Sequence, residues 1–277
     1  MNLFSSLIGV IIAFSAAVCL AQTPKGSVED GPSTHTAQSL LGLVQQAAVA
    51  LPAKATGKDI YVGSYKDIPS LTGVKVPVIV FMHGSSGLSL PAIAQWQLWL
   101  AKQGYASIAP NSFALDKRLS YKSPVDTATY ERVHSLRLSE IEPTLTALKL
   151  APWADTKKMV LAGSSEGSVP VSRYAGTEFA AKIMYAWSCE KNYFVDEPKH
   201  HADLKTPVLN VISSVDPFFS KTNTWIGNDT AVGHCGPALK GNALASVVLL
   251  PDAPHTLFML PAAQNATLGF LLQTLER

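Results

Sequence analysis

A continuous apolar run in the first third of the chain limits the possible folds more than any other feature. Residues Val76–Met82 (VPVIVFM) carry no polar side chain, and Gly84 and Gly87 follow shortly afterwards. A short run of β-branched residues that ends at glycines predicts a strand, and the lack of polar alternation predicts burial of both its faces. Strands of that kind belong to parallel sheets covered by helices. The run therefore favours an α/β fold.

The rest of the chain alternates further short apolar runs with helical patterns. Helices are expected at residues 40–51, 92–103, 130–150, 262–275 and from about 167, and strands at residues 105–109, 158–162, 183–187, 208–213 and 246–250. This alternation indicates one α/β domain with a mainly parallel central sheet flanked by helices. Since no long segment with a pattern of its own interrupts the strands, no large cap domain is expected.

The balance of charge excludes a nucleic-acid-binding protein. The 277 residues include 22 Lys and Arg against 20 Asp and Glu, which gives a formal net charge of +2 at pH 7. Nucleic-acid-binding domains instead show clustered basic residues and a strongly basic balance. We therefore expect no nucleic-acid partner.

The strongest local motif is the segment 158–167 (KMVLAGSSEG), in which a predicted strand leads into Gly-x-Ser-x-Gly and then into a helix. A serine on such a tight turn has strained backbone dihedrals, and its neighbours need to be almost free of side chain. Gly163 and Gly167 provide that room, which would hold Ser165 Oγ above the edge of the sheet. Ser165 is therefore the predicted nucleophile, with an ordinary Gly/Ser turn as the alternative interpretation.

A serine becomes a strong nucleophile when a base removes its proton, and in this motif's usual chain order the base lies downstream. Of the downstream histidines, His255 follows the last predicted strand and would lie at the same sheet edge as Ser165. His234 could line a pocket, and His200 and His201 resemble a solvated pair at the surface. His255 is therefore the predicted base.

The acid that orients the base should end an earlier strand. Asp216 comes shortly after the apolar run 208–213 and directly before Pro217, which predicts that it is this acid. Asp252 is the alternative, but it lies only three residues before His255 on the same loop.

The tetrahedral intermediate of acyl transfer needs two hydrogen-bond donors for its oxyanion. We predict the backbone N–H of Glu166, directly after the nucleophile, and that of Ser85 in the loop after the first central strand, with Ser86 as the alternative. His83 is expected to hold this loop by hydrogen bonding rather than to act as a base. The Glu166 carboxylate could disfavour anionic substrates or pair with an arginine such as Arg173.

Aromatic residues gather in and beside two long irregular segments, 188–205 and 217–241, which follow strands. Ligands bind at the carboxyl ends of parallel strands, so these segments are candidates for pocket walls. Trp187, Phe218 and Trp225 are predicted to line an apolar pocket that suits a small or medium ester, together with Tyr193, Phe194 and Phe219. The alternative is that many of these aromatic residues pack in the core.

Together these motifs resemble the α/β-hydrolase superfamily and, within it, the dienelactone hydrolase-type enzymes. The similarity covers residues 76–275 and rests on HGSSG, the Asn-Ser-Phe turn at 111–113, the elbow GSSEGS with the downstream Ser-Arg-Tyr, the Asp216–Pro217 corner and PHTLF around His255. The resemblance implies a Ser–His–Asp esterase mechanism without a cofactor. Dienelactone hydrolases proper carry a cysteine nucleophile, whereas this elbow carries Ser165, which favours a serine carboxylesterase.

The expected function is therefore that of an exported serine hydrolase that cleaves small or medium carboxylic esters through an acyl-enzyme. A serine peptidase of the same fold is one alternative, although the sequence provides no additional cap of the kind that selects peptides. A catalytically inactive hydrolase fold that acts as a binding protein is the other alternative.

The expectation of export comes from the first 21 residues, which carry no charged side chain and are mostly small or apolar. Small residues at Cys19 and Ala21 match the positions that a signal peptidase reads, which predicts a signal peptide at residues 1–21. We therefore expect a secreted or periplasmic protein without stable membrane association, the alternative being an uncleaved N-terminal anchor. Residues 22–56 are expected to form a linker and a helix, and residues 57–277 the catalytic domain.

Two cysteines, Cys189 and Cys235, remain after removal of the leader. An even number of cysteines in an exported chain predicts a disulfide, which would tie the two irregular segments together at the rim of the pocket. Two buried free thiols are the alternative. No Cys/His spacing indicates zinc, so no metal is expected.

Overall fold

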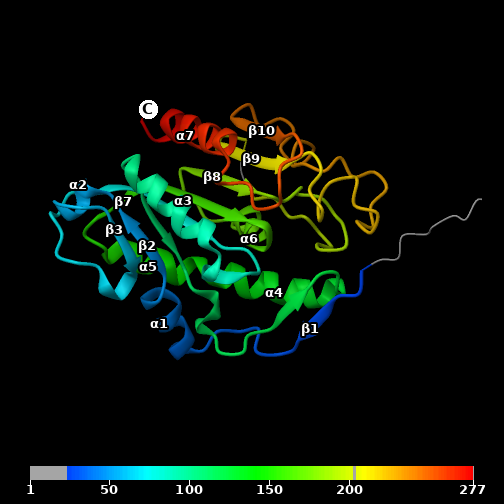
Figure 1. Cartoon of the computed structure of the whole chain (residues 1–277), viewed down its shortest axis with the longest axis horizontal. Coiled ribbons are helices and arrows are strands. Elements are labelled where there is room, and N and C mark those ends of the chain that lie inside the picture. The colour runs from blue at the N-terminus through cyan, green and yellow to red at the C-terminus, as the bar shows by residue number, and fades with distance from the viewer. Residues whose placement is uncertain (1–23, 202–203, 277) are drawn as a thin grey trace, which may run out of the picture.

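Eight strands pair into one central sheet in this computed structural model, which describes residues 24–201 and 204–276 (Figure 1). In order across the sheet they are β10 (Ala245–Leu250), β9 (Val208–Ser213), β8 (Ala181–Tyr185), β7 (Ala154–Ser164), β4 (Val76–Met82), β5 (Ala106–Ala109), β2 (Ala48–Leu51) and β3 (Tyr61–Ser64). Neighbours from β10 to β5 run parallel, whereas β2 pairs antiparallel with both β5 and β3. The expected α/β fold with a mainly parallel central sheet is therefore confirmed. The predicted signal peptide at residues 1–21 lies outside the described residues.

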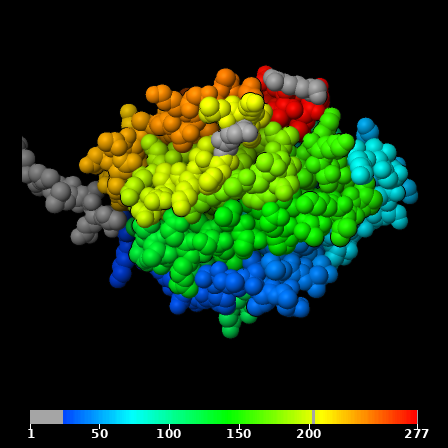
Figure 2. Space-filling view, turned by 180° about the vertical axis from the view of Figure 1, so that it is seen from behind, coloured from blue at the N-terminus to red at the C-terminus, as the bar shows by residue number. Residues whose placement is uncertain are grey.

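Helices cover both faces of this sheet (Figure 1). One face carries α3 (Pro91–Lys102) and α7 (Pro261–Leu275), and the other carries α1 (Ala37–Gln45), α4 (Thr127–Ser139), α5 (Ile141–Leu150) and α6 (Ser168–Arg173). Shorter elements are α2 (Ala53–Thr56), the paired strands β1 (Ser27–Glu29) and β6 (Ser120–Lys122), and the 3₁₀ turns η1 (Tyr65–Asp67), η2 (Gly87–Ser89), η3 (Ser112–Ala114) and η4 (Ser165–Gly167). In the view from behind, N-terminal elements lie along one side of the molecule and C-terminal elements along the opposite side (Figure 2).

The position of strand β4 in the sheet explains why its sequence does not alternate between apolar and polar residues. Ile79 and Phe81 belong to the core under α3 and α7, whereas Val78, Val80 and Met82 belong to the core on the opposite face. All five side chains are fully buried. Because helices cover both faces of the strand, none of these positions requires a polar side chain.

The N-terminal helix is shorter than its apolar spacing predicts. It ends at Gln45, and residues Ala48–Leu51 form strand β2 instead of further helical turns. The neighbouring strands decide this, because β2 lies between β5 and β3 and pairs with both. Sheet pairing here overrides a helical pattern, as tertiary context often does. Residues 24–56 consequently contribute one strand to the central sheet.

The predicted helix over residues 130–150 is divided in two. Helix α4 ends at Ser139 and α5 begins at Ile141, with Glu140 between them. Pro143 has no N–H group to donate. In a continuous helix over residues 130–150 this would leave one backbone hydrogen bond unmade, whereas in the first turn of α5 an N–H would have no helical acceptor in any case. The break matters for the site, because Glu140 and Arg137 beside it are fully buried.

Candidate active site

The turn that carries Ser165 has the strained geometry that its sequence predicts. Strand β7 ends at Ser164, the 3₁₀ turn η4 follows, and Ser165 has a φ of +55°. A Cβ atom on Gly163 would overlap the carbonyl oxygen of Gly167, and one on Gly167 would overlap the carbonyl oxygen of Met82. Both glycines are therefore required for the close approach of β4, β7 and the turn that presents Ser165.

His255 is hydrogen-bonded to Asp216, as its position after a strand predicts. The two side chains follow β10 and β9, and His255 Nδ1 lies 2.7 Å from Asp216 Oδ2. Asp216 is fully buried, and its other oxygen accepts the backbone N–H groups of Phe218 and Phe219 at 2.9 and 3.0 Å. Asp252, the alternative acid, is exposed. The arrangement leaves His255 Nε2 free of this acid and able to serve as a base.

Ser165 and His255 line one cavity of about 450 Å³. Ser85 and Ser86 of the loop after β4 line it too, so both candidate oxyanion residues of that loop are at the site. The described residues show no hydrogen bond between Ser165 and His255 (the nearest hydrogen-bonded partner of His255 is Asp216). Such bonds are often long in enzymes without substrate and shorten in the complex.

Aromatic rings form most of the remaining wall of this cavity. Of the six predicted pocket aromatics, four line it: Tyr193, Phe194, Phe219 and Phe218, whose ring centroid lies 4.7 Å from that of His255. The other wall residues are Tyr121, Lys122 and Ser123. These three lie in and beside strand β6, far from the irregular segments in the sequence, and no local signal marks them as pocket residues.

The other two predicted pocket residues do not line the cavity. Trp187 is fully buried in the core, because its large apolar ring follows strand β8 into a region that is closed to solvent. Trp225 packs against Tyr193 and Phe218, with centroid distances of 4.5 and 6.2 Å. It therefore contacts two wall residues without lining the cavity itself, and the prediction that Trp187 and Trp225 line the cavity is wrong.

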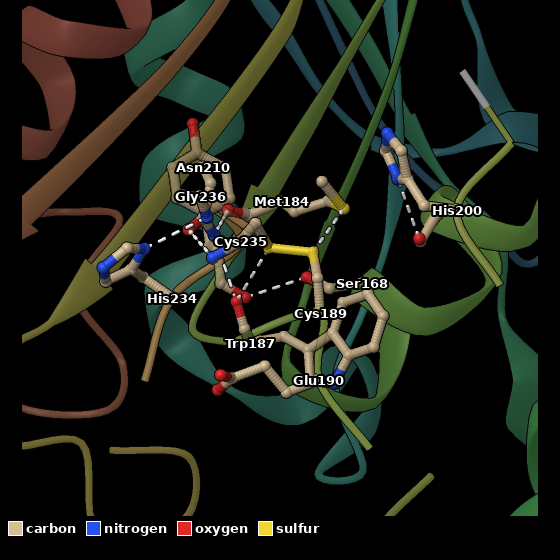
Figure 3. The surroundings of a disulfide bond; sticks show 12 residues. Ser168, Met184, Trp187, Cys189, Glu190, His200, Asn210, His234, Cys235 and Gly236 are labelled. Atoms are coloured by element: carbon tan, nitrogen blue, oxygen red, sulfur yellow. Dashed lines mark hydrogen bonds between the residues drawn. A yellow bond between two sulfur atoms is a disulfide. The ribbon is translucent and has the colours of Figure 1, made fainter. Parts of the chain in front are cut away.

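Cys189 and Cys235 form the predicted disulfide (Figure 3). Both are buried, so the bridge lies inside the molecule and not at the rim of the cavity. The Asn210 side chain fixes its surroundings: its Oδ1 accepts the N–H of Cys235 at 3.0 Å, and its Nδ2 donates to the carbonyl oxygen of Trp187 at the same distance (Figure 3). A disulfide is consistent with an extracellular location. Within residues 24–201 and 204–276, no helix is long and apolar enough to cross a membrane.

The Glu166 carboxylate is bound by two arginines beneath the nucleophile. Its Oε1 lies 3.1 Å from Arg118 Nη2 and 3.1 Å from Arg137 Nη1, and all three side chains are buried. Burial alone would raise the pKa of Glu166, but the two guanidinium groups lower it to about 2. Of the two options that the sequence leaves open, Glu166 therefore pairs with arginines, but Arg173 is not one of them, because it binds Glu131 at 2.6 and 2.9 Å. The carboxylate of Glu166 is thus compensated inside the protein.

Arg118 and Arg137 connect this carboxylate to the surrounding elements. Arg118 donates to Ser112 Oγ at 2.7 Å, in the turn after β5. Arg137 Nε lies 2.9 Å from Glu140 Oε2 at the junction of α4 and α5. Two buried cations and two buried anions therefore lie together, which satisfies the rule that buried charges are paired.

His83 holds the loop after β4, as expected. Its Nδ1 lies 2.7 Å from the carbonyl oxygen of Gly84, and its Nε2 accepts the N–H of Ser112 at 3.3 Å. Burial, with the adjacent Arg137 guanidinium, lowers the pKa of His83 well below its ordinary value. The ring is therefore neutral and occupied by two hydrogen bonds, so it is not available as a base.

The other candidate histidines lie away from the cavity. His234 Nδ1 accepts the N–H of Gly236 at 3.0 Å (Figure 3). His200 is not a solvated surface residue, because it is partly buried and hydrogen-bonds with Ser172 at 3.0 Å, and burial lowers its pKa to about 4. Of the histidines in the described residues, His255 is the one that lines the cavity with Ser165. Within the same residues, no three His, Cys, Asp or Glu side chains gather as metal ligands.

Comparison with solved structures finds the same fold in several hydrolases. A dienelactone hydrolase candidate from Klebsiella pneumoniae has a TM-score of 0.53 and 19% identity, over 76% of this chain and 90% of that chain. A cold-adapted esterase from an Arctic intertidal metagenomic library has a TM-score of 0.53 and 13% identity, over 83% and 95%. A puromycin-hydrolyzing peptidase from Mycobacterium tuberculosis has a TM-score of 0.53 and 15% identity, over 91% of this chain and 39% of that chain.

Comparison of the sequence with curated proteins finds no match, whereas comparison with models of protein families finds one. The model of the dienelactone hydrolase family matches residues 64–259, which include Ser165, Asp216 and His255. The chain therefore belongs to the dienelactone hydrolase family, within the α/β-hydrolase superfamily.

Proposed function

We propose that this chain is an exported serine carboxylesterase that hydrolyses small or medium carboxylic esters. The observation that carries the proposal is the 2.7 Å contact between His255 and the buried Asp216, in the cavity that also contains Ser165 on its strained turn. The substrate would be an uncharged or weakly charged small molecule, in keeping with the small net charge of +2. No cofactor takes part in the proposed reaction.

The proposed reaction has two stages. In the first, Ser165 Oγ attacks the ester carbonyl while His255 Nε2 takes its proton, and the Asp216 carboxylate stabilises the resulting imidazolium through Nδ1–H. Backbone N–H groups of Glu166 and Ser85 (or Ser86) bind the oxyanion. The intermediate expels the alkoxide, which receives the proton from His255 and leaves as alcohol. In the second, His255 takes a proton from a water that attacks the acyl-Ser165 ester, and the acyl–Oγ bond breaks as His255 returns that proton to Ser165 Oγ and the acid leaves.

The surroundings of the acid support its role in this scheme. Both oxygens of Asp216 are engaged, one with the histidine and the other with two backbone N–H groups. The carboxylate therefore has one orientation, and it holds the His255 proton on Nδ1. This tautomer leaves the lone pair of Nε2 available for the proton of Ser165.

Hydrolysis of p-nitrophenyl acetate tests the nucleophile. Ser165→Ala is expected to lower kcat by about 10³-fold or more, because the acyl-enzyme can no longer form. Ser135→Ala, which changes an exposed serine on α4, should retain full activity. A fluorophosphonate probe should label Ser165 in the wild type. Unchanged activity of Ser165→Ala would overturn the assignment, and absence of an adduct would favour an inactive binding protein.

Two further measurements test the remaining parts of the proposal. Peptide nitroanilides and esters of the same acyl group are compared as substrates, and faster cleavage of the amides would favour the peptidase alternative. N-terminal sequencing of protein recovered outside the cytoplasm is expected to start at Gln22. A start at Met1 would contradict the cleaved signal peptide.

A further inference from the structure

A second, much smaller cavity meets the first one at the same serine and histidine. It measures about 60 Å³, against about 450 Å³ for the cavity with aromatic walls. Ser85, Ser86, Ser165 and His255 line both cavities. The two cavities therefore extend from the site of attack in different directions.

The small cavity ends against the core of the protein. Phe81 of β4, Ile93 of α3 and Phe258 form its far wall, and all three are buried members of the core under α3 and α7. The rings of Phe81 and Phe258 pack edge to face, with centroids 5.6 Å apart. Close-packed interiors resist displacement, so this wall cannot retreat to admit a longer chain. Leu90, which is partly buried, closes the cavity from the side of η2.

The large cavity has a different character. Its walls carry the rings of Tyr193, Phe194, Phe218 and Phe219. Its one charged wall residue, Lys122, is exposed to solvent. Rings of this kind contact a flat apolar group edge to face or in offset stacks.

An ester bound at Ser165 has two substituents on its carboxyl group, and the two cavities divide them. The alcohol leaves after acylation, while the acyl group stays on Ser165 until water attacks. The alcohol therefore suits the large cavity, and the acyl group suits the small one, whose far wall belongs to the packed core. A cavity of about 150 Å³ holds one benzene, about 25 Å³ for each non-hydrogen atom, so 60 Å³ holds about two non-hydrogen atoms beyond the carbonyl carbon.

We propose that the small cavity is an acyl subsite limited to acetyl and propionyl groups, and that the enzyme hydrolyses such short-chain esters of aromatic alcohols bound in the large cavity. This inference rests on the proposed esterase function. It adds a substrate specificity that does not follow from the nucleophile: short apolar chains on the acyl side and large flat groups on the alcohol side.

A series of p-nitrophenyl esters from acetate to octanoate tests the acyl limit, because the alcohol stays constant. We expect kcat/KM to be highest for acetate or propionate and to fall at least about tenfold by hexanoate, as one excess methylene in an apolar pocket costs about 10-fold or more. Leu90→Ala should shift the maximum to longer chains. Leu88→Ala is the matched control: this leucine lies two residues earlier, is also partly buried against the same core, and does not line the cavity.

A second variant, with a smaller change in the cavity wall, tests the acyl limit even if Leu90→Ala fails to fold. Ile93→Val removes one methyl group from the far wall and should raise kcat/KM for butyrate relative to acetate without altering the fold. A wild-type profile that rises with chain length, or a Leu88→Ala shift equal to that of Leu90→Ala, would overturn the acyl subsite.

Two isomeric esters test which cavity takes which substituent. Phenethyl acetate carries its ring on the alcohol and ethyl phenylacetate carries it on the acyl group, and the two have the same atoms. We expect kcat/KM for phenethyl acetate to be at least about tenfold higher. Equal or reversed values would overturn the inference alone, provided that Ser165-dependent hydrolysis of p-nitrophenyl acetate is observed. Absence of that hydrolysis would instead overturn the proposed function.

Discussion

At the scale of single residues, the site depends on contacts between side chains that come from separate loops. His255 and Asp216 are 39 positions apart in the chain, yet their atoms lie 2.7 Å apart because β9 and β10 are neighbours in the sheet. Their pairing was predictable, since parallel neighbours bring their carboxyl ends to one edge. The arginine partners of Glu166 were not, because no local pattern marks Arg118 or Arg137 as facing inward.

Asp216→Asn tests the orienting acid. The amide cannot stabilise the imidazolium and favours the wrong histidine tautomer, so kcat for p-nitrophenyl acetate should fall about 10⁴-fold. KM should change little, because Asp216 is buried behind His255 and does not line the cavity. Asp252→Asn, which alters an exposed acid on the same loop as His255, should retain wild-type kcat. The opposite result for the two variants would transfer the role to Asp252.

Glu166 makes stability depend on pH in a predictable direction. Its pKa is lowered from 4.5 to about 2 in the folded protein, so its contribution is complete above about pH 4.5 and is lost as the pH falls towards 2. The shift corresponds to about 3 kcal/mol in the free energy of unfolding. Glu166→Gln should lower this free energy by about 3–5 kcal/mol at pH 7, because two buried guanidinium groups lose their anion.

Urea unfolding at pH 7, 4 and 3 measures this effect. The difference between the wild type and Glu166→Gln should shrink as the pH falls, since the Glu166 carboxylate takes up its proton in the unfolded chain near pH 4.5 but stays ionised in the folded protein until about pH 2. Glu197→Gln, in an exposed ion pair, should behave as the wild type at every pH. A constant difference between wild type and Glu166→Gln from pH 7 to 3 would contradict the assigned pKa.

At the scale of elements, backbone space decides where glycine is needed. Gly167 lies where β4 and β7 converge on the nucleophile turn, and a Cβ there would overlap the Met82 carbonyl oxygen. Gly269 lies inside helix α7, and an added Cβ would meet no atom within 4 Å. The same substitution therefore has opposite consequences in the two elements.

Gly167→Ala and Gly269→Ala form a matched pair. Gly167→Ala should lower the free energy of unfolding by at least about 2 kcal/mol and reduce activity, since β4 or the Ser165 turn must move. Gly269→Ala should raise it by up to about 1 kcal/mol, because alanine is the better helix former. Urea unfolding and p-nitrophenyl acetate hydrolysis measure both effects. Equal changes in the two variants would show that the turn has more room than described.

At the scale of the whole molecule, the disulfide joins the two long loops that follow β8 and β9. Cys189 and Cys235 are 46 positions apart, and both are buried. In the chain-entropy account, a bridge that closes a loop of this length restricts the unfolded chain and stabilises the fold by about 4 kcal/mol. The bridge therefore holds the segments that carry the cavity wall without forming part of it.

The double variant Cys189→Ala/Cys235→Ala tests this role. We expect the free energy of unfolding in urea to fall by about 4 kcal/mol, while kcat/KM of the folded protein changes less than about threefold. Wild type kept under strong reductant during unfolding is the parallel measurement, and it should approach the stability of the variant. A large loss of activity in a variant of wild-type stability would mean that the bridge shapes the site directly.

The sequence by itself determined the α/β fold, the turn around Ser165 and the positions of Asp216 and His255. Each of these follows from a local pattern, because burial removes polar alternation and a tight turn demands glycine. Only the tertiary structure decided that residues 48–51 are a strand, that Trp187 lies in the core, and that Tyr121 lines the cavity. The physical reason is that pairing, burial and enclosure depend on segments far apart in the chain, and their distances are set only when the whole sheet and its helices pack together.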